Sequence, residues 1–457
     1  GVAGIVRNLT QPETAAELGL YGEHLLAPDR RDVIYSFTLY EATPTENLLR
    51  VQVDNWNQPL DVNEGTKLDL GSTAKLRTLV HYLEIVARLH ATYAGEPPQK
   101  LRRSMNPEQS VLRSWALDFL STSEDTSLTA MLDAAMQRSY SSSTGETFFT
   151  GGGQHTFVNL SEDDDNQRFT VEAAFRQSIN LVFIRLMRDI VRFAQEELPS
   201  YDPALLRDLD HPGRKVYLER FAEKEGKEYL EKFYPRYQGK AGLELLRTAG
   251  DVAGRDKRRL AVVFRSVRPT ALPEEFERFL TDRLGPAALK PGEARQLFDT
   301  YGPDKFDLHD RGYIAHLHPL ELWLVGYLDQ HPGATWSQVV EASRGARVDS
   351  YKWLLESKSR DKQNTRIRIV IEDDAFRIIH QAWRKVGYPF ESLVPSYATS
   401  IGSSGDRPAA LAELMGILVQ DGVRLPSWRL GRLDFARGTP FETVLDRDTV
   451  TGQRVLP

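Results

Sequence analysis

A serine stands three residues before a lysine in the stretch DLGSTAKLRT, residues 69–78, directly after Gly71. If a helix begins here, Lys75 lies one turn along from Ser72 on nearly the same face, and its amine reaches the hydroxyl. A lysine that packing desolvates has a lowered pKa, so it can accept the proton of the serine hydroxyl. Ser72 and Lys75 are therefore a candidate nucleophile and base for acyl transfer. An N-cap serine followed by a solvated lysine explains the same spacing.

A second Ser-x-x-Lys runs from Ser359 to Lys362 in the stretch SKSRDKQNTR. Charged residues surround it, and we interpret it as part of a solvated surface. Spacing alone does not separate the two copies, so the elements around each must do so.

Two further polar residues, Ser178 and Asn180, interrupt an apolar stretch in RQSINLVF. Helical spacing of apolar residues predicts one continuous helix over 170–198 that contains both of them. Polar groups beside a buried face need partners or a ligand. Asn180 can donate to a substrate amide and Ser178 can relay a proton to a leaving group, while a satisfied buried pair is the alternative interpretation.

Other polar residues are weaker candidates. His155 lies in the long Ser/Gly/Asp loop that precedes Ser178, where it is a possible ligand-facing residue. The acidic stretch SEDDDNQ, 161–167, lacks the spacing of an EF-hand and indicates a solvated loop rim. Histidines and carboxylates gather in HDRGYIAHLHPLE and suggest a divalent cation, although coincidence on a surface is the simpler reading; they are His309, Asp310, His316, His318 and Glu321. We predict no metal and no cofactor.

The elements around these residues follow from composition and periodicity. Residues 33–56 predict a β-hairpin, because two β-branched and aromatic stretches flank the turn TPTEN. Residues 72–94 predict a long amphipathic helix that begins at Ser72. Residues 199–388 are rich in charge and carry apolar residues at helical spacing, which indicates a separate helical unit. A glycine loop, a helix over 408–421 and a terminal hairpin with its turn at 446–452 complete the chain.

Composition excludes several classes of protein. The chain has 457 residues, 41% of them hydrophobic and 27% charged, which is ordinary for a soluble globular protein with more than one domain. A formal net charge of -6 argues against a general nucleic-acid binder. The absence of cysteine excludes disulfides, thiolate zinc sites and cysteine nucleophiles. No long apolar run or signal peptide occurs, so we expect either a cytosolic protein or a piece of a longer chain.

Three phrases in a fixed order resemble the transpeptidase domain of class A, bifunctional, penicillin-binding proteins. They are NQPLDVNEGTKLDLGSTAKLRTL, RFTVEAAFRQSINLVFIRLMRD and SYATSIGSSGDRPAALAELMGILVQDGVRLP, which begin at residues 57, 168 and 396. In that family the first motif is Ser-x-x-Lys after a glycine, the second is Ser-x-Asn, and a Gly-Ser loop and a helix precede the third, Lys-Thr-Gly. We find no Lys-Thr-Gly, and 149–152, 437–439 and 450–452 are poor substitutes. We therefore expect a fragment whose full-length protein carries a glycosyltransferase domain and a membrane anchor.

The resemblance implies an α+β fold of the serine transpeptidase type, an antiparallel sheet flanked by helices, with the helix of Ser72 buried beneath it. It implies a linker at 1–30, a first part of the transpeptidase domain at 31–195, a charged helical insertion at 196–390 with no assigned role, and a second part at 391–457. Ser72 would be the acylated nucleophile, with its own N–H as half of an oxyanion hole, and Lys75 its base. Ser178 and Asn180 would form the second motif, while Gly71 and, more weakly, His155 would contact substrate.

The implied function is cross-linking of peptidoglycan at the periplasmic face of the bacterial inner membrane. Stem peptides ending in D-Ala-D-Ala would acylate Ser72, and β-lactams would do so by mimicking that dipeptide; no nucleic acid would bind. A first alternative is a non-catalytic scaffold or regulator that acts through the helical insertion. A second is a β-lactamase-like hydrolase, for which we identify no deacylating base.

Overall fold

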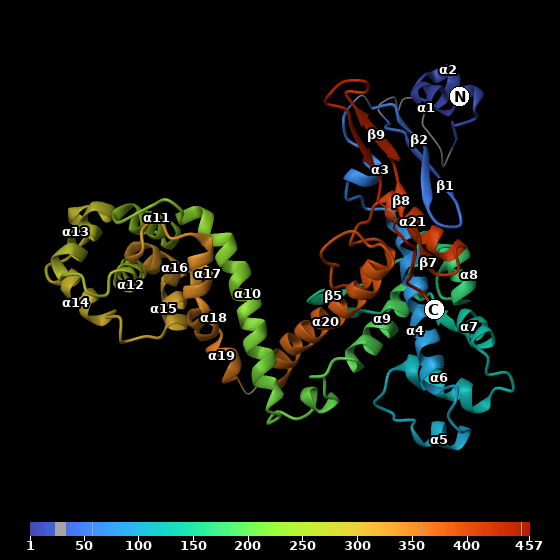
Figure 1. Cartoon of the computed structure of the whole chain (residues 1–457). Coiled ribbons are helices and arrows are strands. Elements are labelled where there is room, and N and C mark those ends of the chain that lie inside the picture. The colour runs from blue at the N-terminus through green and yellow to red at the C-terminus, as the bar shows by residue number, and fades with distance from the viewer. Residues whose placement is uncertain (23–32, 57, 358, 449) are drawn as a thin grey trace. The chain divides into compact units, whose positions relative to one another are not determined.

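The chain forms two compact units in the computed structural model, which describes residues 1–22, 33–56, 58–357, 359–448 and 450–457 (Figure 1). The first unit comprises Gly1–Tyr201 and Glu372–Pro457, and the second comprises Asp202–Ile371. The helical unit thus ends earlier than the 196–390 expected from the sequence. The reason is helix α20 (Arg360–Lys385), whose periodicity continues without a break through the boundary while its second half packs into the core of the first unit.

The predicted N-terminal hairpin is confirmed. Strands β1 (Ser36–Ala42) and β2 (Asn47–Asp54) pair antiparallel, and Thr43 Oγ1 donates to the Glu46 carbonyl in the turn. The third strand of this sheet, β8 (Ser427–Trp428), pairs with β2 in parallel. The expectation of an antiparallel sheet is therefore wrong for this pair, because the chain reaches β8 by a helical crossover and residue alternation carries no information about strand direction.

The other strands form two-stranded ladders. The pairs are β3 (Ser139–Ser141) with β6 (Arg168–Thr170), β4 (Phe148–Thr150) with β5 (Gly153–His155), β7 (Val423–Arg424) with β11 (Gln453–Arg454), and β9 (Arg432–Phe435) with β10 (Thr443–Asp446). The terminal hairpin turns at 436–442, where Ala436 and Gly438 have positive φ, and not at 446–452. Residue 449 of the expected turn lies outside the described residues.

Helices are the main regular elements of the first unit. They are α1 (Val2–Asn8), α2 (Pro12–Glu17), α3 (Val62–Gly65), α4 (Ala74–Tyr93), α5 (Pro98–Arg103), α6 (Val111–Thr122), α7 (Leu128–Met136), α8 (Val171–Arg176), α9 (Asn180–Glu196), the second half of α20, and α21 (Pro408–Val419). In the expected linker at 1–30, residues 1–22 carry α1 and α2, and 23–30 lie outside the described residues. The predicted C-terminal helix at 408–421 is confirmed as α21.

The core of the first unit is built on α4, α6, α9 and the second half of α20. From α4 it takes Tyr82, Ile85 and Val86, which recur at the helical spacing seen in the sequence. The first half of α9 is buried from Leu181 to Met187, and its residues there are apolar except Arg185, which pairs with Glu146. These two helices therefore form a rigid support for side chains at their N-terminal ends.

The second unit is helical, as its charge-rich amphipathic sequence predicts. Its helices are α10 (Gly213–Tyr237), α11 (Leu243–Ala253), α12 (Lys257–Val267), α13 (Pro273–Leu284), α14 (Glu293–Thr300), α15 (Leu308–Ala315), α16 (Pro319–Gln330), α17 (Trp336–Ala342), α18 (Arg344–Asp349), α19 (Lys352–Leu355) and the first half of α20. It has its own core, in which Phe264 contacts Phe276 and Phe279.

Among all the described helices of the chain, none is both long and apolar enough for a bilayer crossing.

Candidate active site

The amine of Lys75 is the centre of a polar cluster, the Lys75 cluster, formed with Ser72, Ser178 and Asn180. Its Nζ lies 3.0 Å from Ser72 Oγ, 2.9 Å from Ser178 Oγ, 2.6 Å from the Ser178 carbonyl oxygen and 2.7 Å from Asn180 Oδ1. Four acceptors thus surround an ammonium that has three N–H donors. In the neutral amine, one lone pair is free to accept the proton of a serine hydroxyl instead.

Lys75 is buried although its partners reach the surface. Its side chain is 1% exposed, in the second position of α4, and its amine lies 5.8 Å from the centre of the Phe183 ring. Desolvation lowers the pKa of Lys75 from 10.5 to about 8. A base whose pKa lies near neutrality is suited to proton transfer at ordinary pH.

Ser72 itself does not cap the helix. It lies in the 3₁₀ turn η1 (Gly71–Thr73), and α4 begins at Ala74, two residues later than predicted, with Thr73 as its N-cap residue. Its hydroxyl accepts from Lys75, and the residue is exposed. The N-cap interpretation of Ser72 is therefore wrong, because a tight 3₁₀ turn precedes the α-helix and turns the hydroxyl toward the amine.

Ser178 breaks the helix predicted over 170–198 into α8 and α9. Its φ is 59°, in the left-handed region. The amide of Ile179 donates to the Ala174 carbonyl at 2.9 Å and that of Ser178 to Phe175 at 3.3 Å, the two bonds of a Schellman C-cap. Glycine usually occupies this position, so a serine here carries a backbone cost that is common at functional sites. The left-handed turn aims both Ser178 oxygens at Lys75.

Asn180 opens α9 and uses both ends of its amide. While Oδ1 accepts from Lys75, Nδ2 donates to the Val158 carbonyl at 3.1 Å. The next amide, of Leu181, donates to Asn159 Oδ1, and Asn159 Nδ2 donates in turn to Asp165. The loop before the second motif is therefore tied to the start of α9, which fixes the amide orientation of Asn180. Sequence reasoning missed Asn159, since a loop asparagine gives no periodic signal.

A second glycine lies directly behind Gly71. Gly402 has a φ of 117°, and a Cβ on it would lie 2.7 Å from both Cα and O of Gly71. Gly71 itself has a φ of 54°. The close approach therefore excludes a side chain at Gly402, whereas a Cβ on Gly71 would meet nothing within 4 Å and only its positive φ favours glycine there. The glycine loop after η5 (Tyr397–Ile401) thus supports the turn that carries Ser72.

A buried ion pair holds the same loop. Asp406 accepts two hydrogen bonds from Arg77, one of them from Nη2 at 3.2 Å, and both side chains are buried. Asp406 also exchanges backbone hydrogen bonds with Leu68, at 2.8 and 3.0 Å. A buried arginine and carboxylate are costly unless each is fully paired, so this pair fixes the register of the loop against α4. No pattern in the sequence indicates that Arg77 and Asp406 lie together.

A buried carboxyl group lies where α20 enters the first unit. Glu372 accepts from Thr150 Oγ1 and from the Gly151 amide, and the Tyr397 amide donates to Thr150 Oγ1 at 3.0 Å. Burial raises the pKa of Glu372 from 4.5 to about 7. This carboxyl thus joins the β4–β5 hairpin and the start of η5 to α20.

The other candidates make contacts of their own. His155 is exposed in β5, and its ring lies near Phe157 and Gly151. Lys362 is exposed over the Trp353 ring, as expected for a solvated Ser-x-x-Lys. Residues 162–164 form a 3₁₀ turn in an exposed loop.

The histidine-rich stretch is divided among structural contacts. Glu321 accepts from Arg236 and Tyr237, and His318 accepts from the Leu320 amide and stacks on Tyr229. Among the residues that the structure describes, no group of three or more histidines and carboxylates is arranged to hold a metal ion.

Comparisons with models of protein families, with curated proteins and with solved structures found no significant match.

Proposed function

We propose that the chain is a serine acyltransferase of the peptidoglycan D,D-transpeptidase type, with Ser72 as its nucleophile. The observation that carries the proposal is the buried Lys75 amine, with a pKa lowered to about 8, within 3.0 Å of the hydroxyls of both Ser72 and Ser178. The ordered phrases that resemble class A penicillin-binding proteins support the substrate class and the serine transpeptidase fold. Gly71, held against Gly402, would keep the turn open toward substrate.

The proposed first half-reaction begins with proton transfer between Ser72 and Lys75. Neutral Lys75 takes the proton of Ser72, and Ser72 Oγ attacks the carbonyl carbon of the D-Ala-D-Ala peptide bond. The tetrahedral oxyanion forms near the N-terminal end of α4, where the backbone N–H of Ser72 would donate to it. Collapse breaks the C–N bond, and the proton passes from Lys75 through Ser178 to the departing amine of D-Ala. An acyl ester on Ser72 remains.

The second half-reaction reverses these roles. An amine on a neighbouring stem peptide attacks the ester carbonyl, loses its proton toward Ser178 and Lys75, and Ser72 Oγ leaves with a proton from Lys75. Asn180 would donate to the backbone of the bound stem peptide when its Nδ2 exchanges the Val158 carbonyl for substrate. With a β-lactam the reaction would stop after the first half-reaction, because no acceptor amine attacks the acyl ester that forms on Ser72.

This activity would place the protein at the periplasmic face of the inner membrane, in a longer chain with a glycosyltransferase domain and an anchor.

A second candidate function is a non-catalytic scaffold that keeps the site architecture without turnover. The separate helical unit, with its own core, favours it. In that case Ser72 would remain unmodified by any acylating substrate analogue.

The test is covalent labelling of the intact protein with a fluorescent penicillin, followed by peptide mass analysis. We expect an adduct on Ser72 that is lost in Ser72→Ala and retained in Ser359→Ala, the matched control in the second Ser-x-x-Lys. A D-Ala-D-Ala thioester should compete with labelling. An adduct on another residue, or none on a correctly folded protein, would refute the acyltransferase and leave the scaffold.

A further inference from the structure

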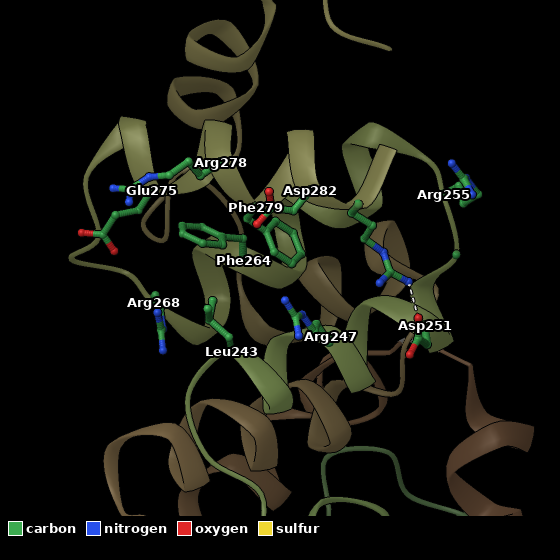
Figure 2. A pocket seen from close by; sticks show the side chains of 12 residues that line it. Leu243, Arg247, Asp251, Arg255, Phe264, Arg268, Glu275, Arg278, Phe279 and Asp282 are labelled. Atoms are coloured by element: carbon green, nitrogen blue, oxygen red, sulfur yellow. Dashed lines mark hydrogen bonds and ion pairs between the residues drawn. The ribbon is translucent and has the colours of Figure 1, made fainter. Parts of the chain in front are cut away.

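An arginine-lined groove of about 930 Å³ lies in the second unit, between α11 and α13 with α12 beneath (Figure 2). Five arginines and three carboxylates line it, a formal excess of two positive charges. The whole chain has a net charge of -6, so the groove is a local basic site on an acidic protein. Its lining residues of either charge are Arg247, Asp251, Arg255, Arg268, Glu275, Arg278, Asp282 and Arg283.

Two of these arginines belong to the structure of the groove. Arg283 pairs with Asp251 at 2.7 Å and packs on Gly250, where a Cβ would lie 3.1 Å from its guanidinium carbon. Arg268 forms a two-point ion pair with Asp329, at 3.1 and 3.2 Å. Both guanidinium groups are therefore held in place before any ligand binds, which lowers the entropic cost of binding.

The other three arginines have no such partner. Arg247, Arg255 and Arg278 are exposed and form no ion pair with any residue in the described part of the chain. Arg247 lies at the centre of the groove, and Arg278 and Arg255 lie toward its opposite ends (Figure 2). A row of unpaired guanidinium groups fits carboxylates spaced along an extended ligand.

An apolar patch lies beside Arg247. Phe264 and Phe279 lie side by side there and are buried, with ring centres 5.3 Å apart, whereas Leu243 opposite them is 54% exposed (Figure 2). An exposed leucine beside aromatic rings favours burial against an apolar side chain of a ligand. Glu275 and Asp282 also line the groove and would repel a uniformly charged polyanion such as a nucleic acid.

We propose that this groove binds an acidic segment of a partner protein, with carboxylates on Arg247, Arg255 and Arg278 and an apolar side chain against Leu243. The charge of the lining selects the carboxylates, and the exposed leucine selects a peptide over a simple polyanion. This inference does not rest on the proposed catalytic activity.

The test uses fluorescence anisotropy of the intact protein with three short fluorescein-labelled peptides at about 0.15 M salt, where long-range attraction is screened. The parent peptide has glutamates flanking two leucines, the second has serines in place of the leucines, and the third has lysines in place of the glutamates. We expect saturable binding of the parent alone, weakened about tenfold or more by Arg247→Glu and by Arg278→Glu. Arg295→Glu, an exposed arginine of α14 outside the groove, is the matched control and should leave binding unchanged.

Three results would overturn the proposal. The first is no saturable binding of the parent peptide by a protein with a normal thermal transition. The second is equal binding by the Arg247 and Arg295 variants, which would place the interaction elsewhere. The third is equal binding of the leucine and serine peptides with displacement by heparin, which would show general attraction of polyanions. Ser72→Ala should bind as the unmodified protein does, so failure of the proposed catalysis and failure of this inference are separable.

Discussion

The lowered pKa of Lys75 makes a quantitative prediction for the rate at which Ser72 is acylated. The amine must be neutral to accept the serine proton, so the rate follows its neutral fraction. With a pKa of about 8 instead of 10.5, that fraction at pH 7 is about one tenth rather than about 3 in 10,000. Desolvation by the fold thus supplies roughly a 300-fold increase in reactive enzyme at this pH.

The shape of the pH profile follows from the same number. We expect the acylation rate to rise roughly ninefold from pH 6 to 7, about fivefold from pH 7 to 8, and less than about twofold from pH 8 to 9. Lys75→Arg replaces the amine by a group that stays protonated throughout, so it should lower the rate by about 100-fold or more and remove the midpoint.

The assay is the second-order rate constant for labelling of Ser72 by fluorescent penicillin, measured by rapid quench and gel fluorescence across this range. Because Glu372 also titrates near pH 7, the series is repeated in Glu372→Gln, in which a midpoint that belongs to Lys75 must persist. A flat profile, a midpoint near 10, or a Lys75→Arg variant that labels at the normal rate would refute the assignment of Lys75 as base.

Three further predictions concern the residues that form or support the Lys75 cluster. Ser178→Gly removes a hydroxyl, so we expect slower labelling of Ser72. The same change relieves a positive φ, so the free energy of unfolding should equal that of the parent or exceed it by up to about 1 kcal/mol, and a lower value would argue against the strained turn. Gly402→Ala places a Cβ against the Gly71 backbone, so it should slow labelling and lower the free energy of unfolding by about 1–3 kcal/mol. The control Gly416→Ala in α21, where the added Cβ meets open space, should leave labelling unchanged, and equal effects of the two variants would contradict the close backbone approach. Glu372 keeps its proton in the native state at pH values where the unfolded chain has lost it. Its contribution to the free energy of unfolding is therefore complete below pH 4.5 and falls by about 3 kcal/mol as pH rises toward 7. Denaturant titrations of Glu372→Gln should show a flatter dependence of stability on pH, and an unchanged dependence would contradict the raised pKa.

Local elements were the most predictable part of the fold. The β1–β2 hairpin and α21 follow from turn chemistry and periodicity, because neighbours in the sequence decide them. The helix over 170–198 was mispredicted at Ser178, since a serine in the left-handed position of a Schellman turn carries no glycine to announce it. The boundary of the helical unit was placed too late, because the amphipathic pattern of α20 is the same on both sides of Ile371.

Of the candidate site, the sequence alone determined that Ser72 and Lys75 lie one turn apart, because residues three apart near a helix start are neighbours. It also excluded every chemistry that needs a thiol. Only the tertiary structure decided that Ser178 and Asn180, more than 100 residues away, supply the remaining partners of the amine, and that Gly402 and Asp406 support the turn. The lowered pKa of Lys75 is likewise a tertiary property, because desolvation depends on the atoms that distant segments pack around the amine. Local periodicity indicates only that one face of a helix is buried, and it does not indicate which segments bury it.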